Sequence, residues 1–205
     1  MDVACQAKWD RSSRAYDWVS WAEERRFASA KRALFSKMVG RCLMVAAGTG
    51  RDFQFFPPGL QVTAIDISLG MVEQARSRAA AYPGELGVEV CDVQALAFGD
   101  ACFDTVVTSC TFCSVPDPLR GLRELYRSLK PGARILMFEH VRSRLGPIAI
   151  VQDLMSPITR RFGPEMNRDT VDNVVRAGFE LLCERNVYMD VVKAIEARRP
   201  WGGGR

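Results

Sequence analysis

The spacing of hydrophobic positions changes near Gly40. Residues 9–39 have a helical pattern and contain no proline. Beyond Gly40, short continuous apolar runs of strand length alternate with amphipathic segments of helical period. The predicted strands cover 42–47, 61–66, 87–93, 103–109 and 134–140, and the predicted helices between them cover 69–81 and 117–129. Continuous apolar strands alternating with helices predict a parallel sheet covered on both faces, which is the doubly wound α/β class.

The last third of the chain has a different pattern. Residues 146–163 form an interrupted helical stretch, and residues 167–179 predict a helix that Asp169 or Asn167 caps. The segment 180–197 then predicts two strands with a tight turn between them. This hairpin would add an antiparallel strand and bring the sheet to seven strands, and the residues after it, 198–205, would form a flexible tail.

Basic residues are concentrated near the N-terminus. The net charge is only +4, but residues 8–37 hold eight lysines and arginines against four acids. Trp9, Tyr16, Trp18 and Trp21 are interleaved with them. This composition suits contact with an anionic membrane surface or an anionic ligand. The alternative is a solvated helix whose aromatic side chains pack on the domain.

The location of the protein follows from what the sequence lacks. No apolar run approaches the roughly 20 residues of a membrane span, and the first residues carry no apolar signal core. We therefore expect a cytoplasmic protein that contacts the inner membrane surface. The chain also has no long basic stripe, so a nucleic-acid partner is not expected.

Two cysteines form a C-x-x-C pair at Cys110 and Cys113, which invites a metal or redox interpretation. The chain has no second such pair, and His140 is its only histidine. A four-ligand zinc site needs more ligands than these, so we expect no metal. Packing as reduced core cysteines is the alternative.

The stretch "LMVAAGTGRD" runs from an apolar strand into a glycine turn. Gly48 and Gly50 let the backbone turn sharply and approach a ligand without an intervening Cβ. Asp66 ends the second strand, where a carboxylate can accept hydrogen bonds from a ribose diol, and Asp92 ends the third, where it can accept from an adenine amino group. Together these residues predict a nucleoside cofactor.

The identity of the cofactor follows from the spacing of the glycines. The third glycine of a dinucleotide fingerprint would fall at Phe53 counted from Gly48, or at Arg51 counted from Ala46. The chain also lacks a P-loop motif. A cofactor with a nucleoside but no pyrophosphate fits this turn better, and S-adenosylmethionine is the natural candidate.

Four stretches carry a family resemblance: "VAAGTGRDFQFFPPG", "VTAIDISLGMVEQAR", "VCDVQALAFGDACFDTVV" and "RSLKPGARILMFEH". Across residues 9–197 the chain resembles class I S-adenosylmethionine-dependent methyltransferases. The resemblance is to the branch of quinone C-methyltransferases, phosphatidylethanolamine N-methyltransferases and thiol S-methyltransferases. It implies a Rossmann-like domain over 1–205, with S-adenosylhomocysteine as product. Its parts would be an N-terminal helical cap (9–39), a cofactor-binding core (40–140), a substrate-cap insert (141–166) and a C-terminal helix and hairpin (167–197).

The resemblance also assigns roles to individual residues. Gly48 and Gly50 would lie against the methionine part of the cofactor, and Asp66 would take the ribose hydroxyls. The remaining cofactor contacts would be Ile67, Met71, Asp92 and Val93 around the adenine, Ser109 and Cys110 near the sulfonium, and Tyr16 closing over the site. Members often carry an acid where Met44 stands and a glycine where Ala46 stands. If the turn needs a positive φ at Ala46, the methyl group there costs about 1 kcal/mol or more.

Methyl transfer to an activated carbon needs positioning and at most one base. Glu139 and His140, at the end of the fifth strand, are the candidates for a base or an acceptor-orienting group, with Tyr16 as a further catalytic candidate. A hydrogen-bonded strand end is the alternative for His140, and a buried, paired carboxylate is the alternative for Glu139.

The expected substrate caps, 9–39 and 144–166, both mix apolar and basic residues. An apolar cavity with cationic edges suits a small lipophilic acceptor, with a phospholipid amine as the first hypothesis and a thiol or quinone ring as alternatives. Ile150, Leu154 and Met155 are among the expected apolar residues. A non-catalytic cofactor-binding module is the alternative of a different class, and the sequence predicts no oligomeric state.

Overall fold

The computed structural model describes residues 2–162 and 164–202, except for the side chains of residues 12–24 and 160–162. Its centre is a seven-stranded sheet in the order β3-β2-β1-β4-β5-β7-β6. The strands are β1 (Arg41–Val45), β2 (Gln61–Asp66), β3 (Glu85–Val90), β4 (Phe103–Ser109), β5 (Leu129–His140), β6 (Glu180–Tyr188) and β7 (Val192–Arg198). The first five pair in parallel, whereas β7 runs antiparallel to β5 and β6. The predicted doubly wound α/β fold, with its antiparallel C-terminal strand, is confirmed.

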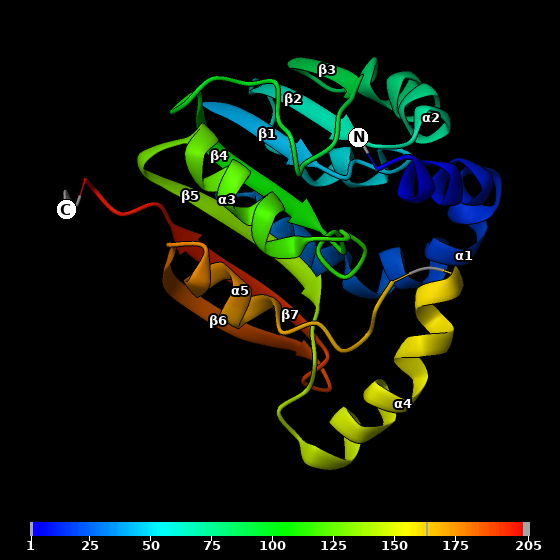
Figure 1. The fold of residues 1–205 in the computed structure, drawn as a ribbon. Coiled ribbons are helices and arrows are strands. Elements are labelled where there is room, and N and C mark those ends of the chain that lie inside the picture. The colour runs from blue at the N-terminus through cyan, green and yellow to red at the C-terminus, as the bar shows by residue number, and fades with distance from the viewer. Residues whose placement is uncertain (1, 163, 203–205) are drawn as a thin grey trace.

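Helices cover both faces of the sheet (Figure 1). They are α1 (Val3–Phe35), the 3-10 helix η1 (Arg51–Phe55), α2 (Leu69–Ala79), α3 (Pro118–Ser128), α4 (Gly146–Phe162) and α5 (Thr170–Arg176). One buried cluster joins the sheet to α3 and α5, and a second joins it to α1, η1 and α2. Central strands such as β1, whose last four residues are buried, therefore face core on both sides.

Helix boundaries follow local capping. Ser68 caps α2, and its hydroxyl accepts from the Met71 N–H at 3.1 Å. Asp117 caps α3, with Pro118 at the first helical position. Of the two candidates for capping the helix of 167–179, Asp169 is the cap: its carboxylate accepts from the Asp172 N–H at 3.3 Å.

Several boundaries differ from the predicted ones. α1 begins at Val3 rather than residue 9, because the Asp2 carboxylate accepts from the Cys5 N–H and caps the helix earlier. α3 ends at Ser128, before the Pro-Gly pair, and β5 begins at once in a short irregular pairing with β4. Gly132 lies inside this extended strand with φ of +79°.

The C-terminal hairpin is present as predicted. Its turn contains Met189 and Asp190, both with positive φ (42° and 59°), as tight hairpin turns require. Arg198 ends β7, within the segment expected as a tail, and the Arg199 guanidinium donates to three carbonyls around the end of α3. Among the described residues, no helix combines the length and apolarity needed to cross a bilayer.

Candidate cofactor site

A cavity opens at the carboxyl ends of the parallel strands, where ligands bind in open α/β sheets. It measures about 690 Å³, counted with its mouth, and we call it the strand-end cavity. Nine of the eleven predicted cofactor-binding residues line it: Ala46, Gly48, Asp66, Ile67, Met71, Asp92, Val93, Ser109 and Cys110. Gly50 is not part of the lining, and the side chain of Tyr16 lies outside the described residues.

Asp66 lies at the end of β2 and is 7 % exposed. One carboxylate oxygen accepts from the Gly48 N–H at 2.8 Å and the other from the Ser68 N–H at 2.9 Å. Burial raises the pKa of this carboxyl above its ordinary value and the nearby Asp10 carboxylate adds to the shift, while the backbone donors of Ser68, Gly48 and Ile67 oppose it only in part. A carboxylate has about four acceptor positions, so capacity remains for a further donor such as a ribose hydroxyl.

The glycine turn after β1 has two functions. Gly48 lies in the cavity wall with φ of +56°. Gly50, with φ of +83°, packs instead inside the protein: a Cβ there would approach Phe53 Cε2 to 2.7 Å and Ala75 Cα to 3.1 Å. Gly50 is therefore needed for packing against η1 and α2, and its contact with the cofactor stays a prediction.

Ala46 is in the left-handed region, with φ of +52°. It forms part of the cavity wall. From the sequence, the methyl group of Ala46 was expected to cost about 1 kcal/mol or more if φ is positive. Since φ is positive, this cost applies, because a Cβ is strained in the left-handed region. Cys110, at the end of β4 and also in the wall, has a similar φ of +51°.

Asp92 belongs to the loop between β3 and β4. Its carboxylate accepts from the Gln94 N–H at 2.9 Å and from the Asp2 N–H at 3.1 Å. Burial opposes the ionisation of Asp92, but the donors of Gln94 and Asp2 outweigh it and hold its pKa below the ordinary value. The site thus contains one carboxylate with a raised pKa and one with a lowered pKa.

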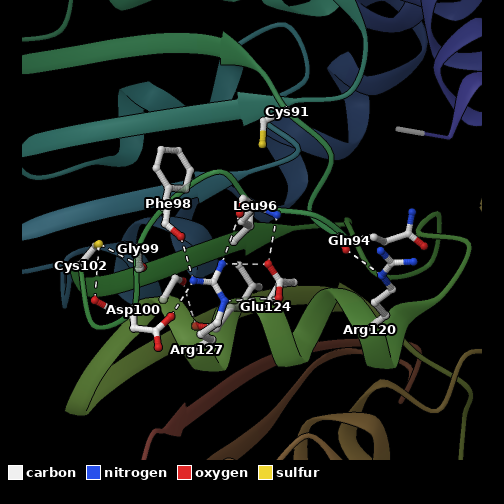
Figure 2. Close-up of polar contacts among 12 residues, drawn as sticks. Cys91, Gln94, Leu96, Phe98, Gly99, Asp100, Cys102, Arg120, Glu124 and Arg127 are labelled. Carbon is white, nitrogen blue, oxygen red and sulfur yellow. Dashed lines mark hydrogen bonds and ion pairs between the residues drawn. The ribbon is translucent and has the colours of Figure 1, made fainter.

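The loop that carries Asp92 is fastened to α3 by two arginines (Figure 2). Arg120 donates to the Gln94 carbonyl at 2.8 Å. Arg127 donates to the Phe98 carbonyl at 2.8 Å, to Asp100 at 2.7 Å and to Glu124 at 2.9 Å. Glu124 in turn accepts from the Leu96 N–H at 3.1 Å. This network fixes the loop on the helix and thereby holds Asp92 in place.

The first turns of α1 form a wall of the cavity that the sequence did not reveal. Cys5 and Trp9 line it. The Asp10 carboxylate accepts from the Ser68 hydroxyl and from the Gly70 N–H at the start of α2. Docking of this kind depends on contacts between residues some 60 positions apart, for which local periodicity carries no signal.

Glu139 is fully buried beneath the loop that follows β4. Its carboxylate accepts from the Thr108 hydroxyl at 2.6 Å, the Thr111 N–H at 3.2 Å and the Phe112 N–H at 3.1 Å. Burial raises its pKa to about 7 in spite of these donors. Glu139 does not line the strand-end cavity; it holds the loop that does. Glu139 is thus a buried carboxylate with hydrogen-bond partners, which was the alternative considered from the sequence.

His140 lies next to Cys113, behind the cavity wall. Burial raises the pKa of the Cys113 thiol, and a hydrogen bond with His140 opposes that shift. The same thiol donates to the Cys110 carbonyl at 3.2 Å. His140 is thus linked to the wall through Cys113, and its role as a base stays a prediction.

The segment 144–166 differs most from expectation. Ile150, Leu154 and Met155 were expected to contribute to an apolar substrate cavity, but they are 51–72 % exposed on α4. α4 stands away from the sheet (Figure 1). The residues beyond Cys110 that line the cavity come instead from the loop after β4, namely Thr111, Ser114, Val115 and Pro116. These residues could have been predicted from the sequence, because they directly follow Ser109 and Cys110, which were already expected at the site.

Comparisons with known proteins agree with this geometry. A family model described as a methyltransferase domain matches residues 43–137. A thiol S-methyltransferase of Homo sapiens is 32 % identical over 184 residues, which cover 78 % of this chain and 72 % of the relative. The chain belongs to the class I S-adenosylmethionine-dependent methyltransferases.

Two further proteins are similar to this methyltransferase. A phosphatidylethanolamine N-methyltransferase of Cereibacter sphaeroides is 31 % identical over 130 residues, 60 % of this chain and 62 % of the relative. A solved S-adenosylmethionine-dependent methyltransferase from Methanosarcina mazei superposes with a TM-score of 0.63 at 22 % identity, over 79 % of this chain and 93 % of that one. The latter shows the fold alone.

The residues of the methyltransferase fit this cofactor. Asp66 has acceptor capacity for the ribose hydroxyls, and Asp92, in the loop after β3, lies in the same cavity wall, where it would accept from the adenine edge. When bound, S-adenosylmethionine supplies a methyl group activated by a sulfonium. The chain itself contributes a cavity that is charged around Asp66 and Asp92 and neutral around Ser109, Cys110 and Thr111. This division orients a nucleoside by its hydroxyls and leaves the other end to the acceptor.

Proposed function

We propose that this methyltransferase transfers a methyl group to the sulfur of a small lipophilic thiol. The observation that supports this most directly is the neutral lining beyond β4: among the described residues, this end of the cavity consists of Ser109, Cys110, Thr111, Ser114, Val115 and Pro116. The carboxylate of Glu139 lies behind this wall with three donors already on it.

A thiol suits such a lining because it supplies its own nucleophile. With a pKa near 8.5, a thiol is partly ionised at neutral pH and is intrinsically a strong nucleophile. An alkylamine, with a pKa near 10.4, is almost wholly protonated and needs a group to remove its proton. The ring carbon of a reduced quinone, a hydroquinone, becomes a good nucleophile only when a base removes the proton of its phenolic hydroxyl.

The relatives also favour this acceptor. The human thiol S-methyltransferase covers more of the chain (78 %) than the phosphatidylethanolamine enzyme (60 %) or a ubiquinone/menaquinone C-methyltransferase of Geobacter sulfurreducens (52 %). A phospholipid amine, our first hypothesis from the sequence, is the second candidate. The outward apolar side chains of α4 favour it, because they suit a protein that works at a lipid surface.

The proposal is tested in two steps. Calorimetry with S-adenosylmethionine should show binding by the wild-type protein and none by Asp66→Ala, which removes the acceptor at the end of β2. No binding by the wild type would overturn the proposal, whereas binding without methyl transfer to any acceptor would favour the non-catalytic module. Labelled methyl transfer is then measured with an alkyl thiol, with phosphatidylethanolamine vesicles and with a demethylated quinone kept in its reduced hydroquinone form. Preferential labelling of the thiol supports the proposal, and labelling of the lipid amine instead would overturn it.

A further inference from the structure

The amphipathic helix α4 is mounted with its polar side toward the protein. At 100° per residue, Ile150, Val151, Leu154, Met155 and Ile158 fall within an arc of about 140°. All five are exposed, from 51 % for Met155 to 72 % for Leu154. We call these five residues the outer face of α4. A contiguous apolar face turned to solvent is unusual for a monomeric protein and marks an interaction surface.

The opposite side of α4 holds the helix in this orientation by hydrogen bonds. Gln152 is buried; its carbonyl oxygen accepts from the Ser143 N–H at 2.7 Å, and its amide donates to the Val141 and Met166 carbonyls at 2.9 and 2.8 Å. The Ser156 hydroxyl, also buried, donates to Asn167 Oδ1 at 2.6 Å. Rotating α4 to bury its outer face would break these bonds and leave buried polar atoms unpaired.

The segment that contains α4 is basic in sequence. Arg142 and Arg144 precede α4, and Arg160 and Arg161 belong to its last turns. Asp153 is the one acid within 142–162, which gives this segment a net charge of +3. Arg142 pairs with Asp153 and Arg144 with Glu184 of β6, and both arginine side chains remain exposed, by 43 % and 68 %.

We propose that the outer face of α4 is a membrane-docking surface whose partner is a bilayer containing anionic lipid. An apolar face on a segment with a net charge of +3 matches an acyl boundary beneath anionic headgroups. A second copy of the chain is a poorer occupant. Pairing two such helices would bring together two segments that each carry this positive charge.

Residues that follow α4 in the chain contact the loop at the acceptor end of the strand-end cavity. The Glu165 N–H, just beyond α4, donates to the Cys113 carbonyl at 2.7 Å. Arg168 donates to the Val115 carbonyl at 3.3 Å. A lipophilic acceptor dissolved in the bilayer would therefore be delivered beside the loop that lines the cavity, and in this respect the inference rests on the proposed function.

The test uses the full chain and vesicles of equal parts phosphatidylcholine and phosphatidylglycerol. The docking variant is Ile150→Gln/Leu154→Gln/Ile158→Gln. A matched control, Val39→Gln/Val175→Gln/Leu182→Gln, changes three exposed apolar residues elsewhere on the surface. The wild type and the control should float with the vesicles, whereas the docking variant should lose about tenfold or more of its bound fraction. Pure phosphatidylcholine vesicles should bind the wild type more weakly.

A second readout keeps the proposal open to refutation if the triple variant folds poorly. Leu154→Trp should add fluorescence that shifts to shorter wavelength with the anionic vesicles, and Val175→Trp should not. Flotation of the folded docking variant at the wild-type level, or no shift for Leu154→Trp, would overturn the proposal. A wild-type dimer that the docking variant dissociates, without flotation of either, would assign the face to a second copy.

Methylation of a water-soluble thiol without vesicles separates the two proposals. The docking variant should retain wild-type turnover in that assay, since its substitutions lie outside the strand-end cavity. Normal turnover of the wild type on this thiol, without its flotation on anionic vesicles, would refute the docking surface and leave the proposed function standing. Flotation of the wild type as expected, without methylation of the thiol, would refute the proposed function and leave the docking surface standing.

Discussion

Replacing Ala46 by glycine tests whether the turn after β1 stores backbone strain. Ala46 has a φ of +52°, which costs a residue with a Cβ about 1–2 kcal/mol. Glycine removes that cost but loses about 0.5–1 kcal/mol through the greater freedom of the unfolded chain. It also loses part of the roughly 0.8 kcal/mol of one buried methyl group, because Ala46 is half-buried. These contributions nearly cancel, so we expect Ala46→Gly to have a free energy of unfolding within about 1 kcal/mol of the wild type.

Ala47 provides a matched control one residue away. It is buried, its φ is not positive, and its N–H donates to the Ile65 carbonyl at 3.0 Å. Ala47→Gly therefore has the entropy loss and the full methyl loss without any relief of strain, which destabilises the protein by about 1.5 kcal/mol. The comparison cancels the entropy terms, and Ala46→Gly should be more stable than Ala47→Gly by about 1–2 kcal/mol.

Urea unfolding of both variants measures the difference, and thermal unfolding should show Ala46→Gly melting about 2–4 °C above Ala47→Gly for each kcal/mol. Equal stability, or a less stable Ala46→Gly, would refute the assignment of strain to this turn. Calorimetry on the same proteins tests the cofactor. If the methyl group is tolerated at the cavity wall, Ala46→Gly should bind S-adenosylmethionine within about threefold of the wild type.

Three further predictions concern charged side chains. Burial raises the pKa of Glu139 to about 7, so its contribution to stability is fully present below about 4.5 and is lost as pH rises through 7. The free energy of unfolding of the wild type, measured in urea, should therefore fall by about 3 kcal/mol between pH 5 and 8, and Glu139→Gln should remove this fall. The same pH dependence in the variant and the wild type would contradict the prediction. Asp190 has a pKa lowered to about 2, because Lys193 and the donors around it outweigh burial, so its contribution is present above 3.8 and lost as pH falls through 2. Asp190→Asn should flatten acid unfolding in that window, and a curve parallel to the wild type would argue against the pairing. Arg127→Met should lower the free energy of unfolding by about 2 kcal/mol and weaken cofactor binding, because it frees the loop that carries Asp92. Replacing the exposed Arg123 by Met should do neither. Equal effects of the two substitutions in urea unfolding and calorimetry would show that the bonds of Arg127 do not hold the loop.

The cofactor site could be predicted from the sequence to the extent that it depends on strand ends. Asp66 and Asp92 each follow an apolar run, and parallel strands end at one edge of a sheet, so their convergence follows from the pattern alone. The role of Gly50 could not be predicted in this way. A glycine needed for a ligand and a glycine needed for packing against Phe53 look the same in a sequence, since both demand a positive φ or a missing Cβ.

The contribution of the first turns of α1 was missed for a different reason. Asp2 and Asp10 act on Asp92, Ser68 and Gly70 across the fold, and their effect depends on where a helix docks rather than on its own periodicity. The Asp2 N–H occupies an acceptor position on the carboxylate predicted to receive the adenine edge. Residues at the start of α1 therefore belong to the surroundings of the cofactor site, although the motifs around the glycine turn do not include them.

The orientation of α4 shows how far periodicity can be trusted. The pattern of 146–163 predicts an interrupted helical stretch, whereas the structure has one continuous helix that runs through Pro157. The usual inference places the apolar side of such a helix against the core. That inference rests on burial being the cheapest use of an apolar face. Here Gln152 and Ser156 meet four specific polar partners on the protein side, and these bonds fix the helix with Leu154 outward. A helix held by its polar side leaves its apolar side for another apolar phase, which is why the outer face of α4 carries information about a partner rather than about the fold.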